Sequence, residues 1–143
     1  MGFKVYDADQ VSITVAGIPI TGGYADGEFC RIEFETDAFS DVAGTDGEVT
    51  RSKSNDRRAT CTLSLMQTAD VNALLSALAA TDRNTPNGAG VGSFLVRDRQ
   101  GTSIYTAEAC WIAKTPDAMF DREATSREWK IRIAKLEDFT GGT

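Results

Sequence analysis

The chain has 143 residues, with 15 basic side chains, 21 acidic side chains, no histidine and a formal net charge of −6. Hydrophobic residues make up 41% and charged residues 25%, which is typical of a globular protein and excludes a disordered one. The lack of histidine excludes Ser-His-Asp and Cys-His catalysis and histidine-ligated zinc. The length predicts a single domain over residues 1–143, and the acidic balance argues against a surface that grips nucleic acid. No apolar run approaches the roughly 20 residues of a membrane helix, so no membrane contact is expected.

Alternation of apolar and polar residues predicts β-strands along most of the chain. In residues 59–66, every second residue is apolar and the residues between them carry hydroxyl groups, which suits a strand with one exposed face. Residues 102–114 alternate irregularly, which indicates either a β-bulge or burial on both sides. The strands predicted in this way are 11–16, 28–35, 59–66, 93–98, 102–114 and 126–137.

One helix is predicted, over residues 69–80. Its apolar residues recur at i, i+3, i+4 and i+7, and Thr68 and Asp70 precede it as candidate N-terminal caps. A turn rich in glycine follows at 82–90. The fold class is therefore mainly β with one flanking α-helix, arranged as a β-sandwich or barrel. The predicted apolar stripe of the helix consists of Val71, Leu74, Leu75 and Leu78.

Two polar stretches interrupt the strands, at 115–125 and at 36–58. The second is long for a connection without secondary structure, and its Asp46-Gly47 turn predicts a short hairpin arm that continues through residues 48–50. Its charge is polarised, which suggests an arm that docks on a neighbouring subunit, with a solvated loop as the alternative. The acidic half holds Asp37, Asp41, Asp46 and Glu48, and the basic half holds Arg51, Lys53, Arg57 and Arg58.

No catalytic, cofactor or metal site is predicted. The chain has no GxGxxG, P-loop or GxSxG motif, and its acidic residues lack the spacing of a calcium loop. Glu33 and Glu35 share one strand face, where a glycosidase pair could sit, but the polar face of a strand produces such pairs routinely.

Cys30, Cys61 and Cys110 form no CxxC motif, and three cysteines cannot all pair within one chain. Two interpretations stay open. The cysteines are either small buried apolar residues or cross-links between subunits outside the reducing cytosol.

Seven short segments, taken in order, resemble the tail tube proteins of contractile-tailed bacteriophages, and the resemblance spans about residues 11–142. It implies a tail-tube-type β-sandwich or barrel protomer whose strands join a multi-subunit barrel in a hexameric ring. The segments are 44–52 (GTDGEVTRS), 55–57 (NDR), 63–68 (LSLMQT), 74–78 (LLSAL), 82–84 (DRN), 87–90 (NGAG) and 127–129 (REW).

The resemblance further implies a virion protein that assembles in the host cytoplasm. Its rings would stack into a hollow tube wrapped by a sheath protein and ended by baseplate and tail-terminator proteins. Tape-measure protein would fill the tube before DNA passes through without specific binding. About 24 strands at ~4.8 Å spacing and ~40° tilt give a backbone diameter of roughly 45–50 Å, wide enough for a duplex.

Within this frame, residues 36–58 would reach the adjacent subunit or ring. The cysteine hypothesis does not come from the resemblance: because a virion persists outside the cell, where disulfides survive, at least one cysteine would cross-link neighbours. One polar strand face would line the channel. The alternatives are a tube protein of a secretion or bacteriocin system, a monomeric β-barrel that binds a ligand, and a hydrolase using Glu33 and Glu35. The candidates for the channel lining are Arg31, Glu33 and Glu35 on one strand, or Thr60, Thr62 and Ser64 on another.

Overall fold

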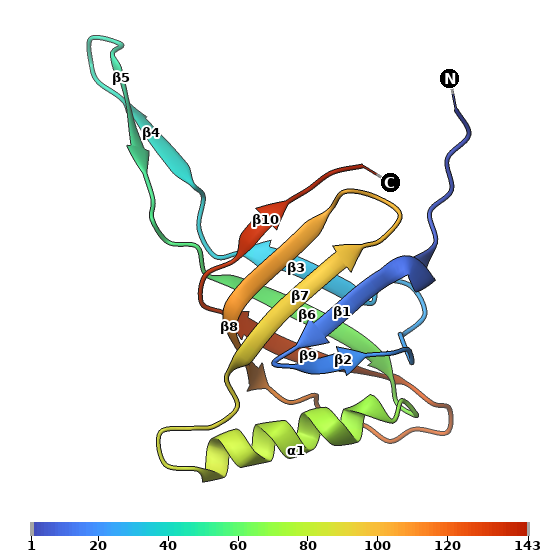
Figure 1. Cartoon of the computed structure of the whole chain (residues 1–143). Coiled ribbons are helices and arrows are strands. Elements are labelled where there is room, and N and C mark those ends of the chain that lie inside the picture. The colour runs from blue at the N-terminus through green and yellow to red at the C-terminus, as the bar shows by residue number, and fades with distance from the viewer. Residues whose placement is uncertain (1, 143) are drawn as a thin grey trace.

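The computed structural model describes residues 2–142, which form ten strands, one α-helix and one short 3-10 helix, Ala8–Gln10 (Figure 1). Eight strands belong to one sheet in the order β2-β1-β7-β8-β9-β6-β3, with β10 also paired to β8. The strands of this sheet are β1 (Val11–Val15), β2 (Ile18–Ile20), β3 (Cys30–Phe34), β6 (Ala59–Met66), β7 (Gly92–Asp98), β8 (Ile104–Lys114), β9 (Ser126–Ile133) and β10 (Glu137–Phe139).

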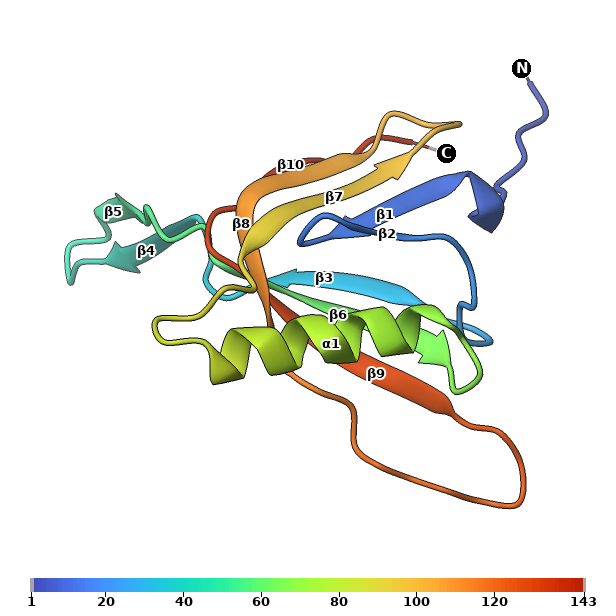
Figure 2. The ribbon, with the colours of Figure 1, turned by 60° about the horizontal axis from the view of Figure 1, so that its bottom comes forward.

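The sheet folds on itself into two layers because β8 is long enough to serve both (Figure 2). Residues 104–106 of β8 pair with β10, and residues 104–110 pair with β7. Residues 110–114 pair with β9. We call β2, β1, β7, the start of β8 and β10 the β1 layer, and β3, β6, β9 and residues 110–114 of β8 the β3 layer.

Register shifts on β8 explain its irregular alternation. One shift lies opposite β7, between Gly92 and Phe94, and the other opposite β9, between Ile112 and Lys114. Each bulge moves the following residues to the other face of the strand. The predicted bulge is therefore confirmed.

Apolar side chains from both layers fill the core. The core is one cluster of buried side chains from the two layers. The β1 layer contributes Ile13, Val15 and Phe94, and the β3 layer contributes Leu63 and Trp129. The alternation predicted for residues 59–66 is confirmed residue by residue, since β6 buries every second side chain. The mainly β fold with one helix is confirmed too.

The helix α1 (Val71–Asn84) closes one end of the sandwich (Figure 1). It buries Val71, Leu75 and Ala79, whereas Leu74 is 57% exposed, so the predicted stripe is wrong at Leu74. The contact is narrower than predicted because the helix lies across the end of the sandwich and not along a broad sheet face. Asp70 occupies the predicted N-cap position, but its side chain does not make the expected capping hydrogen bond.

The start and end of α1 are held by other residues. Asn72 donates from its side-chain amide to the carbonyl of Met66 at 2.9 Å and accepts from the indole N–H of Trp129 at 2.9 Å. At the far end, Asp82 accepts hydrogen bonds from the backbone N–H groups of Ala89 and Gly90, both at 3.0 Å. The helix ends at Asn84, past the predicted end at residue 80, and the hydrogen bonds to Asp82 hold the turn that follows it.

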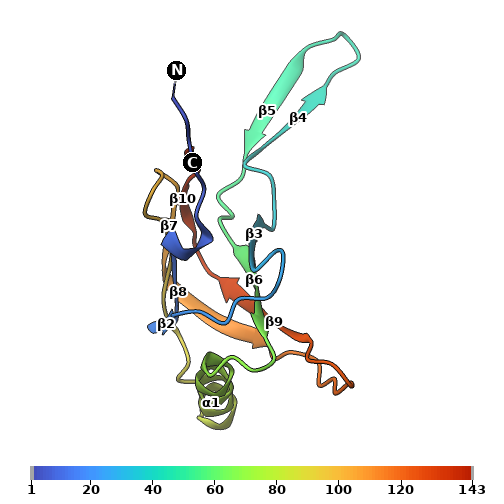
Figure 3. The ribbon, with the colours of Figure 1, turned by 90° about the vertical axis from the view of Figure 1, so that its right-hand side faces the viewer.

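The remaining two strands, β4 (Phe39–Ala43) and β5 (Val49–Lys53), form a separate hairpin that projects from the body (Figure 3). The sequence predicted a hairpin here but shorter strands. The strand predicted over 126–137 ends at Ile133, after which the chain turns into β10. Among the described residues, no helix has the length and apolar character needed to cross a membrane.

Candidate assembly surfaces

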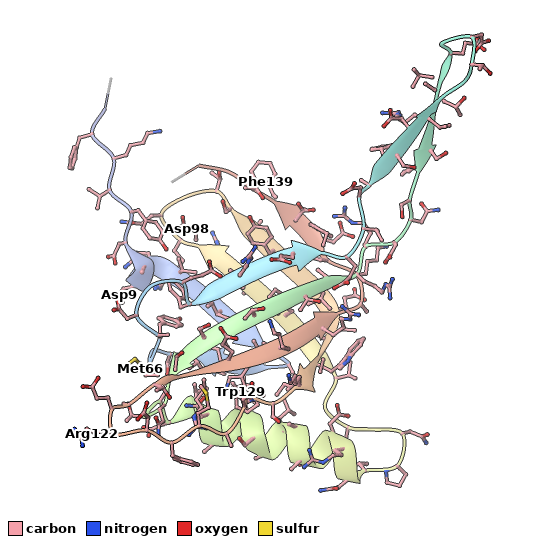
Figure 4. All side chains as sticks on the ribbon, turned by 180° about the vertical axis from the view of Figure 1, so that it is seen from behind. Asp9, Met66, Asp98, Arg122, Trp129 and Phe139 are labelled. Carbon is pink, nitrogen blue, oxygen red and sulfur yellow. The ribbon has the colours of Figure 1, made fainter. Side chains whose placement is uncertain are left out.

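The β3 layer presents a polar face on the side away from the core. Figure 4 shows β3, β6 and β9 side by side on this face with their side chains. The registers place Arg31 opposite Thr62 and Glu33 opposite Thr60. The two sets of candidate lining residues are therefore parts of one face. Besides Arg31, Glu33, Thr60, Thr62 and Ser64, the face contains Glu128, Lys130 and Arg132, and Glu35 follows at the end of β3.

Two of the arginines on this polar face are paired with glutamates of the same face. Arg132 donates to Glu35 and, at 2.8 Å, to the hydroxyl of Thr60, which in turn donates to Glu35 at 2.5 Å. Lys114 of β8 lies opposite Lys130 on the same face, so four cationic and three anionic side chains share the face and its formal charge is +1. Because phosphate affinity depends on uncompensated Lys and Arg, the two arginine–glutamate pairs limit the attraction of this face for DNA. The other contacts are Arg31 Nε to Glu33 Oε1 at 2.5 Å and Lys130 Nζ to Thr62 Oγ1 at 3.1 Å.

Glu33 and Glu35, the candidate hydrolase pair, are each bound by an arginine on this open face. This is the arrangement of surface ion pairs, and it differs from an acid and a base that flank a substrate.

The hairpin β4–β5 exposes all of its strand residues, including Phe39, Val42 and Val49. Asp41 lies opposite Arg51, whose guanidinium stacks over the Phe39 ring at 4.2 Å. At the tip, the side chain of Asp46 accepts from the backbone N–H of Glu48 at 3.1 Å. The hairpin therefore keeps its shape by contacts of its own while its apolar side chains face water.

The base of the arm is fixed by Arg57 and Arg58. Arg57 donates to the carbonyl of Leu136 at 3.0 Å and to Asp138 at 2.6 Å, and it also lies over the ring of Phe34. Arg58 pairs with Asp56 at 2.9 Å, and its hydrogen bonds lower the pKa of Asp56 to about 2. Both arginines thus have partners in their own chain, which leaves Arg51 and Lys53 as the basic residues of the hairpin itself.

The three cysteines lie in or beside the core. Cys61 and Cys110 are buried, whereas Cys30 is half-buried. The sulfur atoms of Cys30 and Cys61 are 3.8 Å apart, and their hydrogen bond raises the pKa of Cys61 well above its usual value. Burial argues against cross-links through Cys61 and Cys110, because their thiols cannot reach another subunit while the protomer is folded. Cys30 is the remaining candidate.

The β3 layer has an unpaired backbone edge on each side. At β3, the N–H of Ser64 donates to the carbonyl of Phe29 and the N–H of Glu35 to that of Arg58. The alternation of an antiparallel ladder then directs the backbone groups of Cys30, Ile32 and Phe34 away from β6.

The second edge is at the end of β8. The N–H of Ala134 donates to the carbonyl of Ala109, so the ladder directs the backbone groups of Ile112 away from β9. Because β7 begins at Gly92, opposite Cys110, it does not cover this last part of β8.

The sequence family described as "Bacteriophage PhiTE tail tube protein" matches residues 8–141. The chain belongs to this family of phage tail tube proteins. It is therefore a structural component of the phage tail and not an enzyme. The resemblance seen in the sequence is confirmed, as is the placement of the protein in the virion.

A phage relative and a solved structure are also similar to this chain. The chain is 29% identical over 144 residues to "Structural protein ORF10" of Pseudomonas phage KPP10, an alignment that covers 97% of this chain and 83% of the relative. Its fold is similar to that of the anti-feeding prophage tube-terminating cap, with a TM-score of 0.60 and 8% identity over 98% of this chain and 94% of the other. At that identity the likeness shows the fold alone.

Sequence reasoning missed the two backbone edges of this tail tube protein. Strand order cannot be read from alternation, because a central strand and an edge strand with one wet face have the same pattern. The short, charged segment 28–35 was the available signal, since charged residues are common on edge strands.

Proposed function

We propose that copies of this chain join edge to edge into rings, the outer edge of β3 in one copy pairing with the end of β8 in the next. The observation that carries this proposal is the β3 layer itself, which has four antiparallel strands and an unpaired edge on each side. With four strands of alternating direction, β3 and the neighbouring β8 run antiparallel, so the ladder continues without interruption. Six copies, the number implied by the family resemblance, give about 24 strands in a closed barrel.

In this ring the polar face of the β3 layer lines the channel. Two of its cations, Arg31 and Arg132, are held by glutamates of the same face, so its net charge is only +1 and DNA can pass without being gripped by its phosphates. The apolar core side, the β1 layer and α1 then face outward. We propose a sheath protein around the tube, tape-measure protein inside it, and baseplate and tail-terminator proteins at its ends, with assembly in the host cytoplasm.

The hairpin β4–β5 is the proposed contact to the adjacent subunit or ring. It projects beyond the body (Figure 3), and Val42 and Val49 are both about two-thirds exposed. A contact between two unlike surfaces that does not close on itself generates a filament, which is what a tube needs.

Negative-stain electron microscopy of the purified chain, with light scattering after size-exclusion chromatography, tests the proposal. Rings or hollow rods are expected. A compact monomer at high concentration would contradict it and would favour a ligand-binding barrel. Single rings that never elongate would instead favour a cap, the role named for the structurally similar prophage protein.

A further inference from the structure

An apolar cleft of about 530 Å³ opens beside the outer edge of β3, between that strand and the β1 layer. Glu28 is the one charged residue among those that line the cleft. The principal apolar lining residues are Val11, Phe29, Cys30, Ile32, Val96 and Tyr105.

The cleft continues the hydrophobic core to the surface. Val11, Phe29, Cys30, Ile32 and Tyr105 all pack against the core and are only partly buried. A wet apolar cleft next to unpaired backbone groups is unfavourable in a free subunit and is typical of a surface that another chain covers.

The opposite edge of the β3 layer carries apolar side chains that match this cleft. Ile112 pairs with the buried Ile131, so its side chain lies on the core side of the sheet. Val91 directly precedes β7, beside the uncovered end of β8, and is 62% exposed. Residues 85–92 contain no charged side chain, so this segment brings no charge that would have to be buried.

We infer that the cleft is filled by Val91 and Ile112 of the next copy of this chain, so that each subunit completes the core of its neighbour. The inference rests on the edge-to-edge ring proposed above. When β3 of one copy pairs with the end of β8 of the next, the core sides of both strands lie on the same side of the joined sheet. Because the two strands run antiparallel, Ile112 then faces Cys30, and Val91, which lies on the residue-110 side of Ile112, faces Ile32.

Val91→Asp tests this contact between the cleft and the neighbouring subunit. Because Val91 is exposed in the free subunit, the substitution should leave the folding of the subunit unchanged. A carboxylate buried in the cleft would raise the concentration needed for ring formation by at least about tenfold. The matched control is Val5→Asp, since Val5 is 57% exposed and does not line the cleft. We expect the control to form rings at the concentration that the unmodified chain requires, and circular dichroism would check that both variants fold.

A second variant uses Cys30, which lines the cleft. Val91→Cys would place a thiol beside Ile32 of the adjacent subunit, within reach of a short linker from Cys30, while Cys61 and Cys110 remain buried. A short bismaleimide cross-linker would then give covalent species up to the full ring on a denaturing gel. The same variant combined with Cys30→Ser would give none.

Ring formation by Val91→Asp at the control concentration would overturn the inference, and so would rings of Val91→Cys that yield no Cys30-dependent cross-link. In either case the rings themselves would leave the proposed function standing. If the unmodified chain forms neither rings nor rods, the proposed function fails and the inference fails with it.

Discussion

Ile32→Pro separates ring formation from folding of the subunit. The backbone N–H of Ile32 points away from β6, so proline removes a donor from the outer edge and leaves the β3–β6 ladder intact. Proline is found on edge strands in this orientation. Within one subunit, Ile32→Pro mainly removes side-chain packing. This lowers the free energy of unfolding by about 0.5–1.5 kcal/mol, as an Ile→Val substitution does.

In the ring, Ile32→Pro weakens every contact between neighbouring subunits. The carbonyl that would accept from Ile32 is left buried without a partner, which costs about 1–3 kcal/mol and weakens each contact roughly 5- to 150-fold. Over six contacts this amounts to about 6–18 kcal/mol per closed ring.

The control is Ile32→Val, which keeps the N–H and removes a similar amount of side chain. Chemical denaturation measures subunit stability, and light scattering measures the assembled fraction. We expect the two variants to have similar stability, while only the valine variant forms rings. Rings of the proline variant at the concentration that suffices for valine would refute pairing through the outer edge of β3.

Three further predictions concern the arm, the cysteines and the helix. Replacing Phe39, Val42 and Val49 together with serine should leave rings intact but prevent rods in electron micrographs, and rods of normal length would show that the arm does not stack rings. A thiol reagent should modify Cys30 in the folded subunit and reach Cys61 and Cys110 only after denaturation, so mass spectrometry that finds either buried thiol labelled first would contradict their burial. Asn72→Ala should lower the free energy of unfolding by about 1–3 kcal/mol, because Trp129 loses the acceptor of its indole N–H, and an unchanged denaturation midpoint would contradict this role.

Asp56 gives a prediction for acid conditions. Its pKa of about 2 lies below the usual 3.8, so its pairing with Arg58 stabilises the fold above pH 3.8 and is lost as the pH falls through 2. NMR titration should find the Asp56 carboxyl still charged at pH 3. Protonation near pH 4 would show that the pair does not form in solution.

The sequence predicted those elements whose pattern depends on local contacts. The strand at residues 59–66 was predicted at its observed bounds, because one face packs on the core and the other meets water. The helix was located correctly, but Leu74 was assigned to its buried stripe because periodicity does not reveal how wide the contact surface is.

Elements without a core-facing side were harder to predict. The hairpin strands β4 and β5 touch no core, so no alternation marks them, and only the turn at Asp46-Gly47 indicated a hairpin. The strand β2 is three residues long and contains Pro19, which breaks the pattern. Likewise, the pairing of Arg57 with Asp138 joins residues 81 positions apart and could not be inferred from charge polarity along the arm.

The central claim is that the β3 layers of neighbouring copies form one continuous sheet around a channel. A cryo-electron microscopy reconstruction of rods assembled from the purified chain tests it most directly. The account predicts that the outer edge of β3 pairs with the end of β8 in the adjacent copy, with Thr60, Thr62 and Arg132 facing the channel. A rod whose subunits meet through other strands, or whose channel is lined by α1 or the β1 layer, would contradict it.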